Sequence, residues 1–230
     1  MRQEVGFTFA NVVIALVLFV AGCAHTGNQA IRPGDYEGKI RVACVGDSIT
    51  YGASIKERSK HNYPVVLGHL LGGKFETANF GVNGATLLKK GDLPHWKTAA
   101  FKKATDFNPQ VVVIKLGTND SKPHNWKHHA EYMADLESMI DHFRGLPSKP
   151  KIWVCLPVPV YQDRWGINKK TVAGEVIPMI RTVTSKMKAP TIDLHSALSG
   201  RPELFPDKIH PNGDGARLMA ETIRDALLGR

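Results

Sequence analysis

The sequence has very few cysteines, and their positions exclude several kinds of chemistry. Its 230 residues include only Cys23, Cys44 and Cys155. The last two each lie in a short apolar run typical of a buried strand, where free cysteines behave as small hydrophobic side chains. They offer neither a disulfide framework nor the spacing of a metal site, and thiols that point into a core are poor candidates for catalysis.

The sequence also lacks an apolar stretch long enough for a comfortable membrane span. Its most apolar block, at about residues 7–21, is shorter than the roughly 20 residues that a transmembrane helix needs, and it is typical of a signal peptide. The residues that follow it, Val20-Ala21-Gly22-Cys23, resemble the bacterial lipobox, in which cleavage leaves a lipid-modified N-terminal cysteine. We therefore predict a lipoprotein signal peptide over residues 1–22 and a membrane anchor on Cys23. The protein would be exported, on the periplasmic or cell-surface side, with plain secretion as the alternative.

Acidic residues are outnumbered by basic ones, 21 to 30, which gives a net charge of +9. The lysines and arginines are spread along the chain and form no single patch interleaved with aromatic residues. A basic solvated surface explains this distribution, with a preference for anionic glycans or membranes as the alternative. The export signal argues against a nucleic-acid partner.

The chain is predicted to form one α/β domain behind a flexible tether. Residues 23–38 contain Gly, Asn, Pro and Asp without apolar periodicity, and the domain follows over residues 39–230. Five strand-like runs then alternate with helical patterns, which predicts a three-layer α/β/α fold around a parallel sheet. The strands are expected at residues 39–45, 75–80, 111–116, 152–156 and 191–194, and the helices at 63–71, 96–105, 126–143, 172–187 and 213–228.

Two of three polar segments stand where such a sheet binds ligands. Ser48 follows the first strand-like run and Asn119 follows the third, at the carboxyl ends where open α/β sheets place their sites. The third segment, with Asp207 and His210 in an Asp-x-x-His pattern, lies just before the last helix. A serine hydroxyl is a poor nucleophile until a base takes its proton. We predict that His210 is this base and that Asp207 orients it.

Acyl transfer also needs hydrogen-bond donors at the developing oxyanion. The candidates are the backbone N–H of Ser48, a backbone N–H of the glycine-containing loop around Gly84, and the side-chain amide of Asn119. Asp47 and Trp165 are the candidate substrate-binding residues. An exposed Trp165 could stack on a sugar ring, although a packing role is the equal alternative.

Two other groups of residues resemble sites without completing one. His124, His128 and His129 lie near a helix start, but no carboxylate at suitable spacing completes a metal site. Asp193 and His195 are a rival acid–base pair at the end of the fifth strand-like run, and Asp207 and His210 are favoured over them. No metal and no cofactor is predicted.

Four motifs in order resemble those of the SGNH (GDSL-type) hydrolase family. The resemblance implies a flavodoxin-like fold with a five-stranded parallel sheet, no metal, and ester hydrolysis through an acyl-enzyme. It also implies the roles of Ser48, Gly84, Asn119 and His210, with Asp207 as the acid. The chain has no Gly-x-Ser-x-Gly elbow, which argues against the α/β-hydrolase fold. The matching motifs are Gly46-Asp47-Ser48, Asn83-Gly84-Ala85-Thr86, Gly117-Thr118-Asn119-Asp120 and Asp207-x-x-His210-Pro211.

Two further segments, residues 115–123 and 161–167, resemble exported bacterial members of that family that act as sialate or xylan O-acetylesterases. We therefore expect an esterase that removes acetyl groups from a glycan or another small ester. A lipid esterase, lysophospholipase or thioesterase of the same fold is one alternative, although only the short apolar stretch 85–88 adjoins the site. A non-catalytic glycan-binding lipoprotein is the other.

Overall fold

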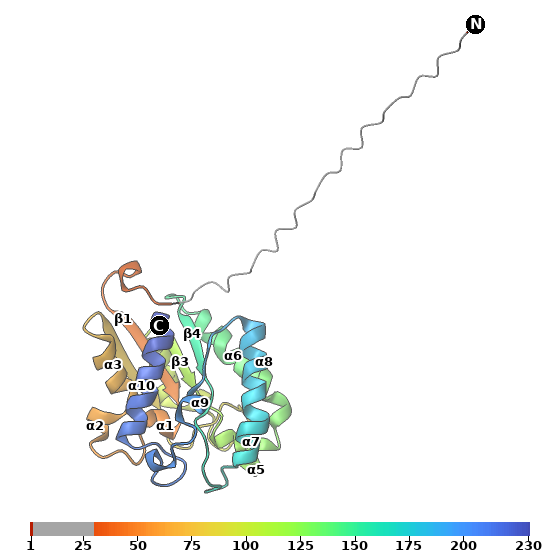
Figure 1. Cartoon of the computed structure of the whole chain (residues 1–230). Coiled ribbons are helices and arrows are strands. Elements are labelled where there is room, and N and C mark those ends of the chain that lie inside the picture. Colours follow the sequence, from red (N-terminus) through yellow and green to blue (C-terminus); the bar gives the residue numbers. More distant parts are fainter. Residues whose placement is uncertain (2–29) are drawn as a thin grey trace.

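The structure, a computed structural model, describes Met1 and residues 30–230 (Figure 1). The predicted signal peptide, the predicted lipidation site at Cys23 and the first part of the predicted tether therefore lie outside the described residues. Within the described part of the chain, no helix is both long and apolar enough to cross a membrane.

The described residues form a parallel sheet of five strands in the order β2-β1-β3-β4-β5. Since β1 lies between β2 and β3, the chain first builds outward on one side of β1 and then crosses to the other. Ligands bind at such a reversal of strand order, beyond the carboxyl ends of the strands. The predicted five-stranded parallel sheet is confirmed. The strands are β1 (Ile40–Gly46), β2 (Phe75–Gly81), β3 (Val111–Lys115), β4 (Lys151–Cys155) and β5 (Thr191–Ile192).

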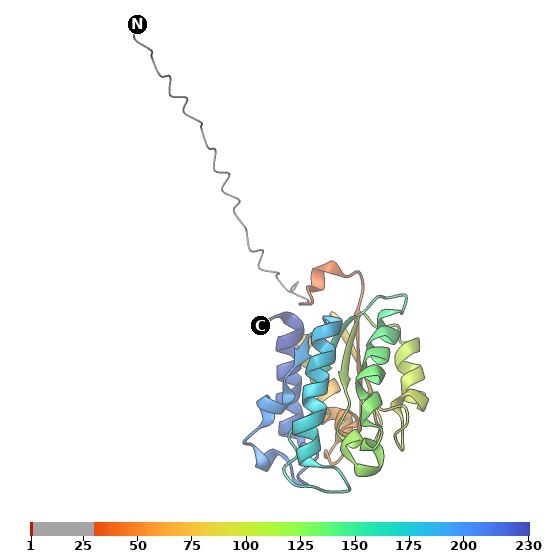
Figure 2. The same ribbon diagram turned by 90° about the vertical axis from the view of Figure 1, so that its right-hand side faces the viewer.

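Helices cover both faces of the sheet, as the two views in Figures 1 and 2 show. One layer includes α3 and α10, which pack against each other, and the other includes α4, α6 and α8. The α-helices are α1 (Ser48–Tyr51), α2 (Arg58–His61), α3 (Tyr63–Leu71), α4 (Ala99–Asp106), α5 (Pro123–Trp126), α6 (Tyr132–Arg144), α7 (Lys169–Thr171), α8 (Ile177–Met187), α9 (Leu194–Leu198) and α10 (Gly213–Leu228). Short 3₁₀ helices are η1 (Pro33–Asp35), η2 (His95–Lys97), η3 (Asn119–Ser121), η4 (His129–Glu131) and η6 (Pro202–Leu204), and η5 (Val172–Val176) is a π-helix.

The central strand β1 divides its side chains between two cores. Val42 and Cys44 belong to the core under α3 and α10, whereas Ala43 and Val45 belong to the core under α4, α6 and α8. This alternation is the two-residue period of a strand, and here both faces are apolar because both are covered. The buried strand can therefore hold the residues that follow it in fixed positions.

The domain begins earlier than predicted. Ile31 is only 2% exposed, and its N–H donates to the carbonyl of Leu227 at 2.7 Å. Residues 31–38, which include η1, therefore adjoin the domain, and that part of the tether prediction is wrong. A single apolar residue among polar ones gives no periodic signal, so the sequence did not reveal this contact.

Three expected elements also differ in extent. The helix expected over residues 126–143 is divided into α5, η4 and α6, and the one expected over 172–187 begins with the π-helix η5. Pro178 stands at the start of α8, where its missing N–H removes a regular helical hydrogen bond. The fifth strand ends at Ile192 because Asp193 begins a helix: its side chain accepts from the N–H of Ser196 as the N-cap of α9.

Candidate active site

Ser48 is placed by the junction between β1 and α1. The strand ends at Gly46, and Asp47 is the N-cap of the short helix, its carboxylate accepting from the N–H of Ile49 at 2.9 Å. Ser48 is the first residue of that helix, at the carboxyl end of a strand buried on both faces. Its hydroxyl therefore lies at the sheet edge where the strand order reverses.

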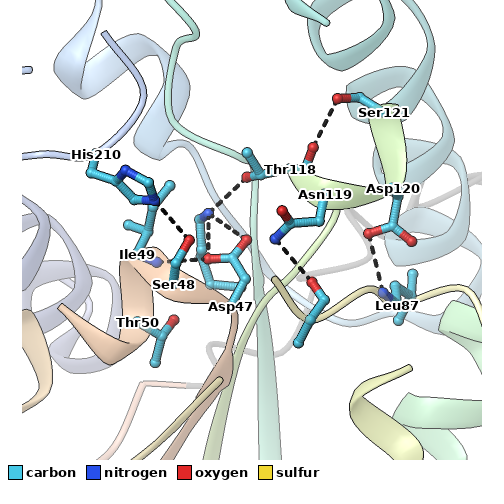
Figure 3. Close-up of polar contacts among 12 residues, drawn as sticks. Asp47, Ser48, Ile49, Thr50, Leu87, Thr118, Asn119, Asp120, Ser121 and His210 are labelled. Carbon is cyan, nitrogen blue, oxygen red and sulfur yellow. Dashed lines mark hydrogen bonds and ion pairs between the residues drawn. The ribbon is translucent and has the colours of Figure 1, made fainter. Parts of the chain in front are cut away.

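The structure brings His210 and Asp207 to this serine, and Figure 3 shows His210 beside Ser48. His210 Nδ1 lies 2.8 Å from Asp207 Oδ2, and His210 Nε2 lies 2.8 Å from Ser48 Oγ. Because a carboxylate only accepts, Nδ1 carries the proton, and Nε2 of the neutral ring accepts from the serine hydroxyl. This is the arrangement in which an imidazole can take the proton of a serine nucleophile.

The carboxylate of Asp207 is held in its charged form. Partial burial acts to raise its pKa, but the backbone N–H groups of His210 and Ile209 and the His210 ring outweigh that effect, and the pKa lies below its usual value. The two N–H groups donate to Asp207 Oδ1 at 2.7 and 2.9 Å, and Ser54 Oγ donates to Oδ2 at 3.2 Å. An ionised, anchored carboxylate can stabilise the imidazolium that forms when His210 takes a proton.

The three candidate oxyanion donors surround one pocket. Its volume is about 290 Å³, and Ser48, Gly84, Asn119 and His210 all line it. The N–H groups of Ser48 and Gly84 have no acceptor among the described residues. Gly84 has φ +81°, which a side chain rarely allows, so glycine here permits the turn that presents its N–H.

Asn119 has one amide hydrogen to spare. Its Nδ2 donates to the carbonyl of Ala85 at 3.1 Å, which fixes the side chain against the Gly84 loop. An NH₂ group has two hydrogens, and the second is left for a ligand. The buried amide is therefore held in place before a substrate arrives.

We expect Asn119→Ala to lower kcat by roughly 10²–10³ with little change in KM, since an oxyanion donor acts mainly when charge develops on the oxygen. Steady-state kinetics on p-nitrophenyl acetate measures both constants. A rise in KM alone would instead assign Asn119 to substrate positioning.

Asp120, next in the chain, is a buried carboxyl that sequence reasoning did not single out. It accepts from the N–H groups of Leu87 and Leu88, at 3.1 and 2.8 Å, and so joins η3 to the loop after Gly84. Burial is the main reason that its pKa is raised to about 7, although those N–H groups act to lower it. Asp120 belongs to the same motif as Asn119, but nothing in the spacing of that motif indicated that the Asp120 side chain points inward.

This raised pKa makes stability depend on pH. Between about pH 4 and pH 7 the folded chain keeps a proton on Asp120 that the unfolded chain releases, so the free energy of unfolding falls as pH rises through that range. The contribution of Asp120 to this slope is at most ~1.4 kcal/mol per pH unit. Urea unfolding at several pH values should show a smaller downward slope for Asp120→Asn than for the unchanged chain. Equal slopes would contradict the assignment.

Asp47, which was expected to bind substrate, is buried beneath the nucleophile. It has no exposed surface, and both of its carboxylate oxygens accept from the Lys115 ammonium, at 3.1 and 3.0 Å. Asp47 lies beside the nucleophile in sequence, but its side chain is turned inward to cap α1. Nothing in the sequence indicated a role for its buried partner Lys115, which belonged only to the segment 115–123 that resembles family members. A lysine at the end of an apolar strand is ordinarily expected to reach solvent.

Trp165 forms one wall of the pocket. It is 55% exposed, and its ring centroid lies 5.6 Å from that of His210. The guanidinium of Arg164 lies 4.4 Å from the indole centroid. Trp165 also adopts a left-handed backbone conformation, φ +52°, which is uncommon for a large side chain and is found at binding sites. It is therefore not a core-packing tryptophan.

The rival residues have other partners. Asp193 caps α9 and accepts from Arg181 at 2.8 Å, and His195 lies within that helix, not on a strand as assumed. His124 is paired with Asp92 at 2.9 Å. In the part of the chain that the structure describes, no group of three or more His, Cys, Asp or Glu side chains is arranged to hold a metal ion.

Comparison of the sequence with known proteins gives two curated relatives. An acetylxylan esterase of Xylanibacter ruminicola is 42% identical over 213 residues, which cover 85% of this chain and 44% of that protein. A multidomain esterase of Ruminococcus flavefaciens is 21% identical over 240 residues, covering 87% of this chain and 30% of that protein. The chain therefore spans less than half the length of either relative.

Solved structures share the fold. Est24, a carbohydrate acetylesterase from Sinorhizobium meliloti, matches with a TM-score of 0.68 and 20% identity over 83% of this chain and 99% of that one. The M. smegmatis aryl esterase matches with a TM-score of 0.65 and 23% identity over 82% and 100%. At these identities the likeness concerns the fold alone.

The family follows from the sequence match across the domain. The profile of the GDSL-like lipase/acylhydrolase family covers residues 44–218, from within β1 to within α10, and so includes all four motifs and the pocket that they surround. The resemblance seen in those motifs is thereby confirmed: the chain belongs to the GDSL-like lipase/acylhydrolase family.

Proposed function

We propose that this domain is a serine-dependent ester hydrolase that removes O-acetyl groups from carbohydrate. The observation that carries the proposal is the continuous chain of hydrogen bonds from Asp207 through His210 to Ser48 at a pocket with oxyanion donors. A protein that only bound glycans would need neither a serine aligned with a base nor donors directed at a developing negative charge.

The mechanism follows from these contacts. His210 Nε2 takes the Ser48 proton as Oγ attacks the ester carbonyl, and Asp207 stabilises the resulting imidazolium. The oxyanion accepts hydrogen bonds from the N–H groups of Ser48 and Gly84 and from the Asn119 amide. His210 then protonates the departing sugar oxygen, which leaves an acetyl group on Ser48. A water molecule, deprotonated by His210, attacks this acyl-enzyme and releases acetate.

Three observations favour acetylated sugars over long-chain lipids. The pocket, at about 290 Å³, is slightly smaller than the range of roughly 300–1,000 Å³ for ligand sites. An exposed aromatic ring adjoins the catalytic imidazole, where a sugar leaving group would stand. The relative with 42% identity is described as an acetylxylan esterase. Lipid esterase activity is the second candidate, since the family also contains lipases.

The test is a comparison of esters. The full chain is incubated with acetylated xylan and other acetylated glycans, and acetate release is measured beside the hydrolysis of p-nitrophenyl esters of increasing chain length. We expect acetate release from a glycan and a steep loss of activity beyond short acyl groups. Preference for long acyl chains would make the protein a lipid esterase, and glycan binding without turnover of any ester would make it a binding protein.

Trp165 gives a prediction about the sugar side of the substrate. We expect Trp165→Ala to raise KM for an acetylated xylo-oligosaccharide and to leave p-nitrophenyl acetate kinetics nearly unchanged, because only the oligosaccharide has a ring to stack on the indole. Trp126 is a partly buried tryptophan whose indole N–H donates to Glu175, so Trp126→Ala serves as a control for general effects of losing an indole. Equal losses on both substrates would contradict the stacking role.

We propose further that Cys23 carries a lipid that anchors the protein to a membrane. The support is the lipobox-like sequence and the geometry of the domain's first residues. Ile31 is hydrogen-bonded to Leu227 in the last turn of α10, whereas His210 lies just before the first turn of this helix, whose 16 residues span about 24 Å at 1.5 Å per residue. The anchor would thus hold the domain by the end opposite the site. Mass spectrometry of the N-terminal peptide tests this, and an unmodified N-terminus after Cys23 would indicate simple secretion.

A further inference from the structure

Beneath the pocket lies a buried ion pair that the proposed mechanism does not use. The Lys115 ammonium donates to both oxygens of the Asp47 carboxylate and, at 2.9 Å, to the hydroxyl of Thr118. Neither charged side chain has any exposed surface. Removing two charges from water costs several kcal/mol per ion, and apolar side chains of similar size often stabilise a fold as well. Stability is therefore a weak explanation for this pair.

The position of the pair gives a better explanation. Asp47 directly precedes Ser48, and Thr118 directly precedes Asn119, so Lys115 contacts the neighbours of two oxyanion donors (Asp47 and Thr118 in Figure 3). Lys115 is also the last residue of β3 and lies in register with the last residue of β1. One ammonium group thus joins the ends of two adjacent strands at the point from which the donors project.

The charge of the pair matters as much as its geometry. Without Lys115, a carboxylate would stand one residue from the serine at which negative charge develops. The Asp47 charge also acts across the site. Burial is the main cause of the raised pKa of Asp120, and the Asp47 charge adds to it. In a site of low dielectric constant such charges interact strongly, so an uncompensated Asp47 would oppose formation of the oxyanion.

We propose that Lys115 is a positioning residue for the oxyanion donors. It holds Ser48 and Asn119 at a fixed separation through Asp47 and Thr118, and it neutralises Asp47 against the charge of the transition state. This inference rests on the proposed function, because it assigns Lys115 to the same ester-hydrolysing site.

The experiment compares Lys115→Met, Asp47→Asn and the double variant in the full chain, with p-nitrophenyl acetate as the substrate. Asn is as good an N-cap as Asp, so Asp47→Asn keeps an acceptor for Ile49, removes the negative charge and leaves one oxygen to accept from Lys115. Met fills much of the lysine's volume and leaves Asp47 without a counter-charge. Thermal unfolding of each variant shows whether it is folded at the assay temperature.

We expect an asymmetric result. Lys115→Met should lower kcat by about 10²-fold, the scale of losing one oxyanion donor, with KM nearly unchanged. Asp47→Asn should lower kcat clearly less than Lys115→Met does. Adding Asp47→Asn to Lys115→Met should restore most of the lost kcat, since the double variant holds no uncompensated charge. Thr118→Val, which keeps the ion pair and cuts only the bond to the second strand end, should give a smaller loss in kcat.

A purely structural ion pair predicts something else. Both single variants would then lose activity equally, in proportion to their loss of stability, and the double variant would show no recovery. That outcome, or a change confined to KM, would overturn the role of Lys115. Two other results test the role of Lys115 if Lys115→Met does not fold. One is a kcat of the double variant about 10²-fold below that of Asp47→Asn, and the other is an unchanged kcat in Thr118→Val. Either result would overturn the role of Lys115. Absence of Ser48-dependent turnover in the unchanged chain would overturn the proposed function together with this inference.

Discussion

Ser48→Ala is expected to abolish turnover while the domain stays folded. Loss of the nucleophile removes the whole acyl-enzyme route, and in serine hydrolases this lowers kcat on the order of 10⁶-fold. The methyl side chain of alanine fits the space of the serine, and only the hydrogen bond to His210 is lost from the fold. Initial rates on p-nitrophenyl acetate, with thermal unfolding measured in parallel, check both parts of this expectation.

A matched serine variant controls for the substitution itself. Ser138 lies on α6, and among the described residues its hydroxyl bonds only to the carbonyl of Ala134, one turn earlier, so Ser138→Ala should keep full activity. Residual activity in Ser48→Ala above about 10⁻² of the unchanged protein would exclude a serine nucleophile at this position. A water molecule activated directly by His210 would then be the simplest remaining mechanism.

The polar residues that follow strands could be placed near one another from the sequence, because a parallel sheet brings the carboxyl ends of its strands to the same edge. Apolar runs predicted the five strands, and the carboxyl ends of neighbouring parallel strands meet at one edge. Ser48 after β1 and Asn119 after β3 were therefore expected to be close. The register of β1 with β3 shows that these two strands are neighbours in the sheet. His210 was harder to place by this reasoning, since it follows no strand, and its position depended on the Asp-x-x-His spacing.

Side-chain direction could not be predicted in the same way. Asp47 lies next to the nucleophile and was expected to contact substrate, yet the N-cap geometry of α1 turns it into the protein toward Lys115. Asp120 follows Asn119 but points to the amides of the Gly84 loop. In both cases a turn or a helix start sets the direction of the side chain, and the pattern of residue types carries no information about it.

Contacts made by isolated residues also escaped prediction. Ile31 packs against the domain although its neighbours are polar, and the sequence around it is typical of a linker. Asp193 begins a helix immediately after a strand of only two residues, so His195 lies on a helix and not at the end of the strand, as was expected. The conclusion that His195 is not the base nevertheless agrees with the contact between His210 and Ser48.

His210→Ala is expected to be as damaging as Ser48→Ala, because nucleophile and base act as one unit and removing either costs on the order of 10⁶-fold in kcat. The imidazole is the only described side chain that is hydrogen-bonded to Ser48 Oγ, and it is also the donor that would protonate the leaving sugar oxygen. Combining Ser48→Ala with His210→Ala should give little further loss, since the effects of a catalytic unit are not additive.

The comparison that makes this prediction decisive is His195→Ala. His195 follows Asp193 by two residues, and burial lowers its pKa, so it is a credible base by chemistry alone. Its place on α9, beside an aspartate that pairs with Arg181, separates it from the serine. We therefore expect His195→Ala to keep near-normal kcat and KM on p-nitrophenyl acetate. A large loss in His195→Ala with activity retained in His210→Ala would move the base to α9 and would require a different nucleophile from Ser48.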